Sequence, residues 1–286
     1  MISCKKYVEI RKKVLKDKIT SLKNNSCLPV PCLAVIQVGS DPASNSYIKG
    51  KIKDGEELGI CVKHETYDSK ISSEELQEVV KSVCNNPYVH GVIVQLPLPE
   101  HCKIDLRTCM DPKKDVDGFL PESPFDPCTP KGIIDWLEYN QFDFTGKNVT
   151  VLGRSKIVGK PLVNMLIDRG ATVTCCNSKT DMPNLYTSIS DLVISAVGKP
   201  KKFDYSYFSA DTIVVDVGIN RDEFGKLCGD IDVEDIREIF NEEEIYVTPV
   251  PGGVGLLTRL ALMENVFQAY LKQEDIKDED LSHERK

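Results

Sequence analysis

The sequence predicts an α/β protein of two domains, each with a mostly parallel sheet. Short apolar runs that suit strands buried on both faces alternate along the chain with segments of helical periodicity. This alternation occurs in two series, the second of which follows Thr145-Gly146-Lys147. At 286 residues the chain has the length of one large or two ordinary domains. Because each series forms its own βα pattern, we expect two α/β domains.

The first series contains three expected helices and two expected strands. Apolar residues recur at helical spacing over residues 10–22 and again over residues 41–59. A third helix is expected after Ser72, because Glu75 stands three residues further on, as in a capping box. Short apolar runs predict strands over residues 31–39 and 89–96.

The second series has the pattern of a dinucleotide-binding sheet. Helices are expected over residues 158–169 and, at the end of the series, over residues 256–271. The tail over residues 274–286 is almost wholly charged and is expected to fray. Four short apolar runs predict strands, and three of them end in glycine: residues 148–153, 171–176, 191–198 and 212–218.

Composition excludes several classes of protein. A net charge of −8 argues against general affinity for nucleic acid, which depends on lysine and arginine. No apolar run approaches the roughly 20 residues that cross a bilayer, and the N-terminus lacks a signal-peptide core, so a cytoplasmic protein is expected. The 11 cysteines form no Cys-x-x-Cys pair, and there are only four histidines. We therefore expect reduced core cysteines and no metal site.

The turn from Gly153 to Gly159 is the first chemical feature. Glycine at a strand end lets the backbone approach a pyrophosphate, and the following helix N-terminus favours its charge; a tight structural turn is the alternative. The next strand ends in Asn177-Ser178-Lys179, without the acid that binds the ribose hydroxyls in NAD enzymes. With Arg154 nearby, this favours NADP, and NAD stays possible.

A second group of residues suits a polar site for a flat ligand. Lys51 lies four residues after Tyr47, so both project from one helix face, although a solvated lysine beside a core tyrosine is the blander interpretation. Gln95 ends a buried strand, where open parallel sheets bind ligands. Asp117-Gly118 is a turn pattern, and Pro249–Gly255 is either a rigid turn or a close approach to a ligand.

Taken together, these segments resemble the bifunctional methylenetetrahydrofolate dehydrogenase/methenyltetrahydrofolate cyclohydrolase family. Order and spacing match roughly from residue 30 to residue 270. The matching segments are Tyr47-x-x-x-Lys51, Gln95-Leu-Pro-Leu-Pro99, Lys114-Asp-Val-Asp-Gly-Phe119, Pro127-Cys-Thr-Pro130, Gly153-Arg-Ser-x-Ile-Val-Gly-Lys-Pro161, Asp216-Val-Gly-Ile-Asn-Arg221 and Pro249-Val-Pro-Gly-Gly-Val-Gly255.

The resemblance implies a division of the chain and an activity. It implies an N-terminal catalytic domain of residues 1–140, completed by a C-terminal helix over 258–286, and a Rossmann-type NAD(P)-binding domain of residues 141–257, with the folate cleft between them. The implied reactions oxidise 5,10-methylenetetrahydrofolate to 5,10-methenyltetrahydrofolate with NADP⁺ and hydrolyse the product to 10-formyltetrahydrofolate. They belong to one-carbon metabolism and serve purine biosynthesis. A homodimer is implied as well.

The resemblance also implies the site residues. Lys51 would be the central catalytic group, with Tyr47 stacking on the folate aminobenzoate, Gln95 bonded to Lys51, and Asp117 accepting hydrogen bonds from the pterin. Further substrate contacts would come from Pro251 and Gly252. The implied cofactor contacts are Gly153, Arg154, Ser155, Ser178 and Ile219.

The chain departs from the family pattern in three places, and three other functions compete with the favoured one. Asn177 stands where the family usually has histidine, Leu256-Leu257 replaces Pro-Met, and Lys156 replaces asparagine. The competing functions are a dehydrogenase without cyclohydrolase activity, a silent folate- or nucleotide-binding protein, and another two-domain Rossmann dehydrogenase acting on shikimate or an amino acid. Lys51 and Gln95 argue against the first, and the whole polar set argues against the others.

Overall fold

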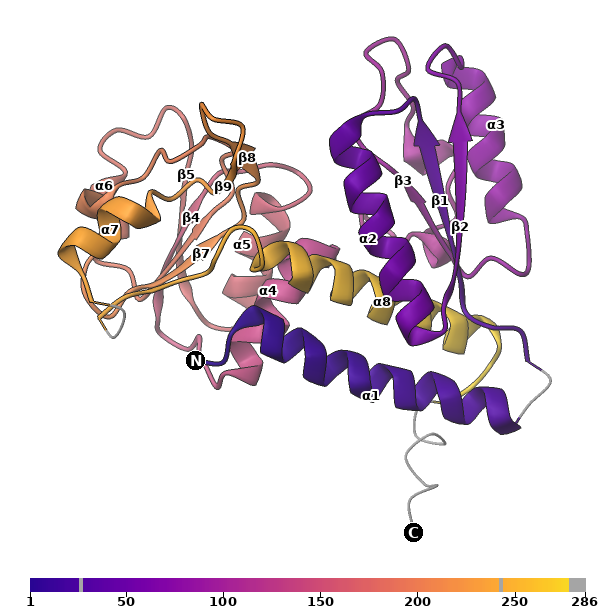
Figure 1. The fold of residues 1–286 in the computed structure, drawn as a ribbon, viewed down its shortest axis with the longest axis horizontal. Coiled ribbons are helices and arrows are strands. Elements are labelled where there is room, and N and C mark those ends of the chain that lie inside the picture. The colour runs from indigo at the N-terminus through magenta and orange to yellow at the C-terminus, as the bar shows by residue number, and fades with distance from the viewer. Residues whose placement is uncertain (26–27, 242–243, 278–286) are drawn as a thin grey trace. The chain divides into compact units, whose positions relative to one another are not determined.

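The computed structural model describes residues 1–25, 28–241 and 244–277. The chain forms two compact units, which confirms the α/β class with two domains. The three-stranded unit comprises Glu9–Cys128 and Arg259–Lys286, of which residues 278–286 lie outside the described part. The five-stranded unit comprises Met1–Val8 and Thr129–Thr258. Figure 1 labels most of their helices and strands.

The three-stranded unit is built on parallel strands in the order β2-β1-β3. The strands are β1 (Cys32–Val38), β2 (Cys61–Tyr67) and β3 (Gly91–Val94). The helices of this part of the chain are α1 (Cys4–Asn25), α2 (Pro42–Leu58), α3 (Ser73–Cys84) and α8 (Val254–Gln273), with the short turns η1 (Leu106–Thr108) and η2 (Pro112–Lys114). Helices α1 and α8 each contribute residues to both units.

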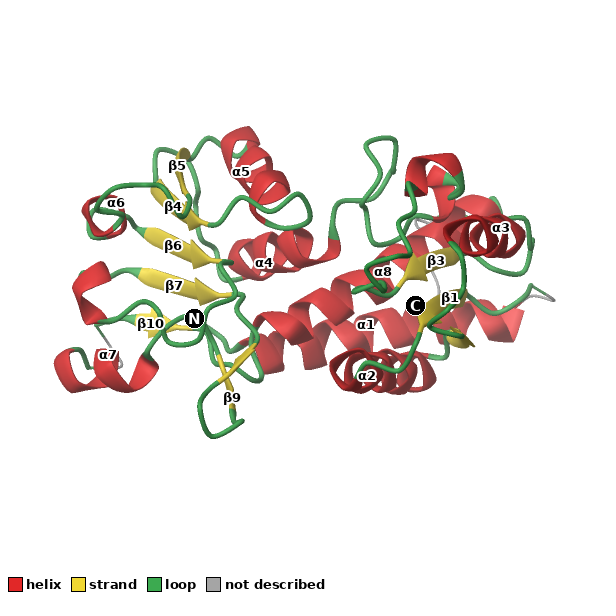
Figure 2. Cartoon of the chain, turned by 90° about the horizontal axis from the view of Figure 1, so that it is seen from above, coloured by secondary structure: helices red, strands yellow, loops and turns green. Residues whose placement is uncertain are grey.

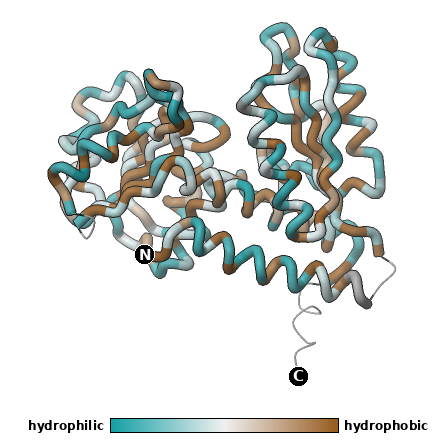
Figure 3. The backbone as a smooth tube through the Cα atoms, in the orientation of Figure 1, coloured by the Kyte–Doolittle hydropathy of each residue, from teal (hydrophilic) through white to brown (hydrophobic). Residues whose placement is uncertain are grey.

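Alternate residues of β1 enter two different hydrophobic clusters, which explains why the strand is apolar from Cys32 to Ile36. Leu33 and Val35 pack with residues of α1, α2 and α8. Ala34 and Ile36 pack with residues of α3 on the opposite face, and Figure 2 shows α2 and α3 on either side of this sheet. In Figure 3 the interior strands of both sheets are correspondingly hydrophobic. The predicted capping box is confirmed, since the Ser72 hydroxyl and the Glu75 carboxylate each accept the other's backbone N–H at the start of α3.

The five-stranded unit carries a parallel sheet in the order β10-β7-β6-β4-β5. Its strands are β4 (Asn148–Leu152), β5 (Thr172–Cys176), β6 (Leu192–Ser195), β7 (Ile213–Asp216) and β10 (Tyr246–Val247), and a ribbon is formed by β8 (Asn220–Arg221) and β9 (Leu227–Cys228). Its helices are α4 (Cys128–Tyr139), α5 (Gly159–Asp168), α6 (Asn184–Thr187) and α7 (Val233–Ile239), with the turn η3 (Tyr205–Tyr207).

The strand order of this sheet creates a place for a ligand. The chain continues from β4 to β5 on one side and then returns to β6 on the other side of β4. Because β4, β6 and β7 run in the same direction, their carboxyl ends lie at one edge (Figure 2). Ligands of open parallel sheets bind at such a reversal point.

Helix α4 groups with the five-stranded unit, so the contact boundary precedes the expected one at residue 140. Trp136 of α4 donates from its indole nitrogen to the Ile2 carbonyl oxygen at 3.1 Å and packs against Tyr246, with ring centroids 5.8 Å apart. The Ile2 backbone N–H donates to the Asn140 side chain at 2.6 Å. These contacts tie the first residues of the chain to α4. None of the described helices is long and apolar enough to cross a membrane.

Candidate active site

Helix α2 carries the predicted catalytic lysine on a well-defined segment. The Asp41 carboxylate accepts the Ser44 backbone N–H at 2.7 Å and caps the start of the helix. Gly59 ends the helix in the left-handed conformation, with φ of 80°. Tyr47 and Lys51 are one turn apart between these limits, so both side chains project from one face, as predicted.

Lys51 lies in a polar but buried environment. Its side-chain nitrogen donates to Gln95 Oε1 at 3.0 Å and lies 4.8 Å from the centre of the Tyr47 ring. Lys51 is only 4% exposed. This burial lowers the pKa of Lys51, because an ammonium group loses hydration, while the negative charge of Asp117 opposes the shift. The neutral amine of Lys51 is therefore easier to form here than in a lysine that is exposed to water.

Asp117 belongs to the same site and is held by a sharp turn. Gly118 has φ of 71°, and a Cβ atom there would lie 2.6 Å from the Pro127 nitrogen, so the turn requires glycine. The Asn265 side chain of α8 donates to the Val116 carbonyl at 2.9 Å and supports the turn. Burial raises the pKa of Asp117, while the positive charge of Lys51 and the nearby Cys128 thiol oppose the change.

An ion-pair cluster holds α2 one turn beyond Lys51. Asp54, which is 3% exposed, accepts from the Lys12 amine at 2.7 Å and lies 3.1 Å from Arg259 Nε. A Cβ atom on Gly50 would lie 1.9 Å from an Arg259 guanidinium nitrogen. Glycine at that position therefore lets Arg259 lie against α2, and the cluster joins α1, α2 and α8 around the Lys51 site.

The turn from β4 to α5 forms one wall of a second site, in the five-stranded unit. Gly153 has φ of 108°, and a Cβ atom on it would lie 2.4 Å from the Ala196 carbonyl oxygen. Only glycine fits this close approach. The Ser155 hydroxyl accepts the backbone N–H groups of Val158 and Gly159 at 3.2 and 3.3 Å, which fixes the turn into α5.

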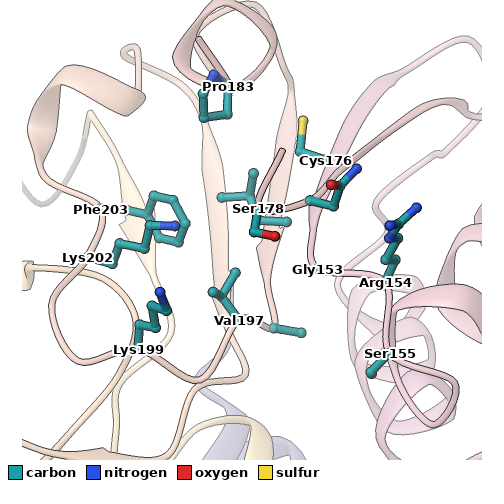
Figure 4. Close-up of a pocket in the computed structure, with 13 residues that line it drawn as sticks. Gly153, Arg154, Ser155, Cys176, Ser178, Pro183, Val197, Lys199, Lys202 and Phe203 are labelled. Atoms are coloured by element: carbon teal, nitrogen blue, oxygen red, sulfur yellow. The ribbon is translucent and has the colours of Figure 1, made fainter. Parts of the chain in front are cut away.

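A pocket of about 350 Å³ opens at the carboxyl ends of β4, β5 and β6. Figure 4 shows Arg154 and Ser155 on one side of it and Lys199, Lys202 and Phe203 on the other. Among the described residues that line the pocket, three are cationic and none is acidic. Its lining residues are Leu152, Gly153, Arg154, Ser155, Cys176, Asn177, Ser178, Pro183, Ala196, Val197, Lys199, Lys202 and Phe203. Such a pocket suits an anionic ligand.

The predicted residues fall into three groups in the structure. Tyr47, Lys51, Gln95 and Asp117 lie together in the three-stranded unit, and Gly153, Arg154, Ser155 and Ser178 line the pocket of the five-stranded unit. The other three residues do not line that pocket. Ile219 is 62% exposed and approaches Gly255, which follows the Pro251-Gly252 pair in the loop that opens α8.

Sequence reasoning missed several residues of these sites. The sequence alone assigns no role to Cys128, whose thiol donates to the Val116 carbonyl at 3.2 Å, next to Asp117. Lys199 and Lys202 follow the strand β6, and that position at the end of a parallel strand was the available clue. Asn265 and Arg259 lie on α8, far along the chain from the residues that they contact, so no local pattern identifies them.

A parallel sheet with a strand-order reversal, a glycine turn and a cationic pocket at the reversal defines a dinucleotide-binding protein of the Rossmann class. Comparison with known proteins gives a narrower assignment. Residues 2–117 match the tetrahydrofolate dehydrogenase/cyclohydrolase catalytic domain, and residues 127–274 match the NAD(P)-binding domain of the same family. The chain therefore belongs to the tetrahydrofolate dehydrogenase/cyclohydrolase family, which confirms the resemblance.

Individual relatives agree with this assignment. The bifunctional protein FolD of Bacillus cytotoxicus is 40% identical over 281 residues, which cover 94% of this chain and 96% of the relative. The crystal structure of the bifunctional enzyme FolD from Campylobacter jejuni superimposes with a TM-score of 0.87 at 39% identity, covering 94% of this chain and 98% of that one. The Trypanosoma brucei methylenetetrahydrofolate dehydrogenase-cyclohydrolase, solved with NADP and an inhibitor, has a TM-score of 0.87 at 28% identity, covering 95% and 97%.

Proposed function

We propose that this chain oxidises 5,10-methylenetetrahydrofolate to 5,10-methenyltetrahydrofolate with NADP⁺ and then hydrolyses the product to 10-formyltetrahydrofolate. The observation that carries the proposal is the buried Lys51, bonded to Gln95 and adjacent to Tyr47, in a chain that matches both domains of the family. A dehydrogenase without cyclohydrolase activity would not need a general base, which the lowered pKa of Lys51 suits. A silent binding protein leaves both sites unexplained.

In the oxidation step the chain binds and orients its substrate. The Tyr47 ring supplies an aromatic face for the folate aminobenzoate, and Asp117 accepts hydrogen bonds from pterin N–H groups. Pro251 and Gly252 add backbone contacts to the substrate. Bound NADP⁺ supplies the hydride acceptor for the methylene carbon. No side-chain nucleophile is needed, because the folate nitrogens bonded to the one-carbon unit stabilise the methenyl cation. Hydride transfer requires the methylene carbon to lie about 3–3.5 Å from the nicotinamide.

In the hydrolysis step Lys51 takes the proton of the attacking water. The methenyl cation needs a hydroxide equivalent, and an amine acts as a general base only in its neutral form. Burial lowers the pKa of Lys51 and so increases the neutral fraction near neutral pH. Gln95 accepts one N–H of Lys51, which orients the amine without adding a charge that would raise its pKa.

The residues of the pocket fit NADP⁺. Gly153 has no Cβ atom and so lets backbone approach the pyrophosphate, next to the N-terminus of α5. Arg154 and Ser178 suit a 2′-phosphate, and no acid stands among the described lining residues to repel it. The relative from Trypanosoma brucei was solved with NADP. NAD⁺ is the alternative cofactor, with Ile219 a further contact in either case.

One assay tests both reactions. The purified full chain is incubated with 5,10-methylenetetrahydrofolate and NADP⁺, and we expect NADPH formation followed by loss of the near-ultraviolet absorbance of methenyltetrahydrofolate. Absence of NADPH formation would exclude the dehydrogenase. Methenyltetrahydrofolate hydrolysis no faster than in buffer would leave a dehydrogenase alone.

An arginine variant tests the cofactor assignment. We expect Arg154→Ala to raise the KM for NADP⁺ at least about tenfold more than the KM for NAD⁺, because a charge-assisted hydrogen bond is worth about 1.5–3 kcal/mol. Lys156→Ala is the matched control, since Lys156 lies in the same turn but outside the residues that line the pocket. Equal losses for both cofactors in Arg154→Ala would mean that Arg154 does not bind the 2′-phosphate.

Two further properties rest on the family relationship alone. We propose a homodimer, for which sedimentation of the purified chain at twice its own mass is the test. We also propose a cytoplasmic location and a role in supplying 10-formyltetrahydrofolate for purine biosynthesis. Growth of a strain lacking the gene with and without purines tests that role.

A further inference from the structure

A buried carboxylate lies beneath the wall of the pocket that carries Lys199 and Lys202. Asp230 has no exposed surface, and its two carboxylate oxygens accept five hydrogen bonds. Three come from consecutive backbone N–H groups and two from side chains. The donors are Val197 N at 2.7 Å, Gly198 N at 3.2 Å, Lys199 N at 2.9 Å, Ser195 Oγ at 2.8 Å and Asn220 Nδ2 at 2.9 Å.

The backbone around Asp230 is adapted to this carboxylate. A Cβ atom on Gly218 would lie 2.3 Å from Asp230 Oδ1, so glycine leaves room for the carboxylate. The backbone N–H of Asp230 donates to Asp216 Oδ1 at 3.0 Å, which fixes the start of its side chain. The Asp230 carbonyl oxygen accepts from the backbone N–H groups of Lys202 and Phe203 at 2.7 and 3.1 Å. One residue therefore bonds to most of the connection that follows β6.

The direction of these bonds determines what the connection presents to the pocket. In a trans peptide the N–H and the preceding C=O point in opposite directions. Because the Val197 N–H points at Asp230, the Ala196 carbonyl points away from Asp230, toward Gly153. Asp230 thus sets the position of Val197 and Lys199 directly and that of the glycine turn through the Ala196 carbonyl. Its bonds influence both walls of the pocket.

We propose that Asp230 is a positioning residue of the dinucleotide pocket, holding the connection after β6 against the Gly153 turn. Three successive N–H groups form an anion-binding arrangement, and here a side chain of the protein itself occupies it. Because these N–H groups donate to Asp230, they are not available to the cofactor phosphates, which bind instead to Gly153–Ser155. The proposal rests on the proposed function for the identity of the ligand.

The test is an Asp230→Asn variant, which keeps the shape of the side chain but turns one acceptor into a donor. We expect the Kd for NADP⁺, measured by titration, to rise at least about tenfold, because several bonds to a charged acceptor weaken together. Hydrolysis of methenyltetrahydrofolate without cofactor should stay within about twofold of wild type. Hydrogen exchange at the amides of residues 197–199 should become faster in the absence of any ligand.

Thr150→Val is the matched control for lost stability. Thr150 lies in β4 of the same sheet, is 1% exposed and hydrogen-bonds to Ser190 at 2.8 Å, and it does not line the pocket. We expect this control to lower the melting temperature and to leave the Kd for NADP⁺ within about twofold. If Asp230→Asn lowered the melting temperature to the same extent and left the Kd unchanged, the positioning role would be refuted.

Ser195→Ala keeps the proposal testable if Asp230→Asn does not fold. This variant removes one donor to the carboxylate and leaves the rest, so we expect a rise of about threefold in the Kd. An unchanged Kd and unchanged exchange at residues 197–199 would contradict the proposal. A wild-type chain without dehydrogenase activity would instead refute the proposed function. The two failures can be told apart, because the exchange measurement needs neither substrate nor cofactor.

Discussion

At Lys51 two opposing effects act on the side-chain amine. Loss of hydration disfavours the ammonium form, and the nearby Asp117 carboxylate favours it. Desolvation is the larger effect, so the pKa of Lys51 falls below the usual lysine value. The partner that the structure gives the amine is an amide, Gln95, rather than a second carboxylate. Because Gln95 carries no charge, it does not raise the pKa of Lys51 again.

A charge change at Gln95 tests this balance. Below its pKa Lys51 is an ammonium group and cannot accept a proton, so enzyme-catalysed hydrolysis should rise with pH and level off above that pKa. In Gln95→Glu a carboxylate would favour the ammonium form and raise the pKa of Lys51, so the rise should move to higher pH. The measurement is the initial hydrolysis rate of methenyltetrahydrofolate against pH, with buffer hydrolysis subtracted.

Gln95→Met serves as the control for the loss of the hydrogen bond alone. It should lower the rate without moving the profile to higher pH, since it introduces no charge. A Gln95→Glu profile that coincides with the wild-type profile would show that Lys51 is not the group that titrates.

At the residue scale, the sequence predicts the contacts that follow from local spacing and not those between distant segments. The four-residue spacing of Tyr47 and Lys51 placed both on one helix face, and the structure confirms this arrangement. By itself that spacing favoured a solvated lysine, and the site was identified only through the matching segments elsewhere in the chain. The contributions of Cys128 and Asn265 depend on contacts between distant segments, which no single-segment pattern contains.

At the scale of elements, the Asp117-Gly118 turn needs a left-handed backbone that glycine provides. Alanine at position 118 would combine an unfavourable φ with a Cβ atom 2.6 Å from the Pro127 nitrogen. We expect Gly118→Ala to displace Asp117, to raise the KM for methenyltetrahydrofolate by about tenfold or more and to lower the melting temperature. Binding of NADP⁺ should stay within about twofold, because the pocket is in the other unit.

Gly146→Ala is the control for the backbone angle alone. Gly146 also has φ of 71°, but no heavy atom lies within 4 Å of its added Cβ atom. It should therefore cost only the roughly 1–2 kcal/mol of a left-handed conformation and leave the substrate KM unchanged. If the two variants lost the same stability and Gly118→Ala kept the wild-type KM, the turn would have no role in binding substrate.

The elements that were predicted are those with strong local patterns. The apolar strands β1, β3 and β4 and the capping box of α3 follow from periodicity and cap chemistry. Strand β2 was missed because it lies at the edge of its sheet and carries polar residues in a weak alternation. The sequence does not predict helix α4, because Pro130 and Gly132 are residues that usually interrupt helices. In the structure Gly132 lets the helix approach the Leu257 backbone, since a Cβ atom on Gly132 would lie only 2.7 Å from the Leu257 carbonyl oxygen.

On the scale of the whole chain, neither the net charge nor the local sequence patterns predict the charge of the pocket or the boundary between the units. The net charge is −8, yet the charged residues that line the pocket are all cationic, so the overall charge says little about the ligand. The family resemblance implies a boundary at residue 140, shortly before the second βα series begins. The contact boundary lies at Cys128 because α4 packs on the first residues of the chain, a pairing across more than a hundred positions that composition does not reveal.

In the proposed function one lysine of this chain, Lys51, carries the hydrolysis of methenyltetrahydrofolate. The most direct measurement compares the hydrolysis rates of wild type, Lys51→Met and Lys49→Met, with the exposed Lys49 of the same helix as the control. We expect Lys49→Met to match wild type, and Lys51→Met to hydrolyse no faster than buffer and to be severely impaired as a dehydrogenase, with its NADP⁺ affinity unchanged. Hydrolysis at the wild-type rate in Lys51→Met would contradict this role of Lys51.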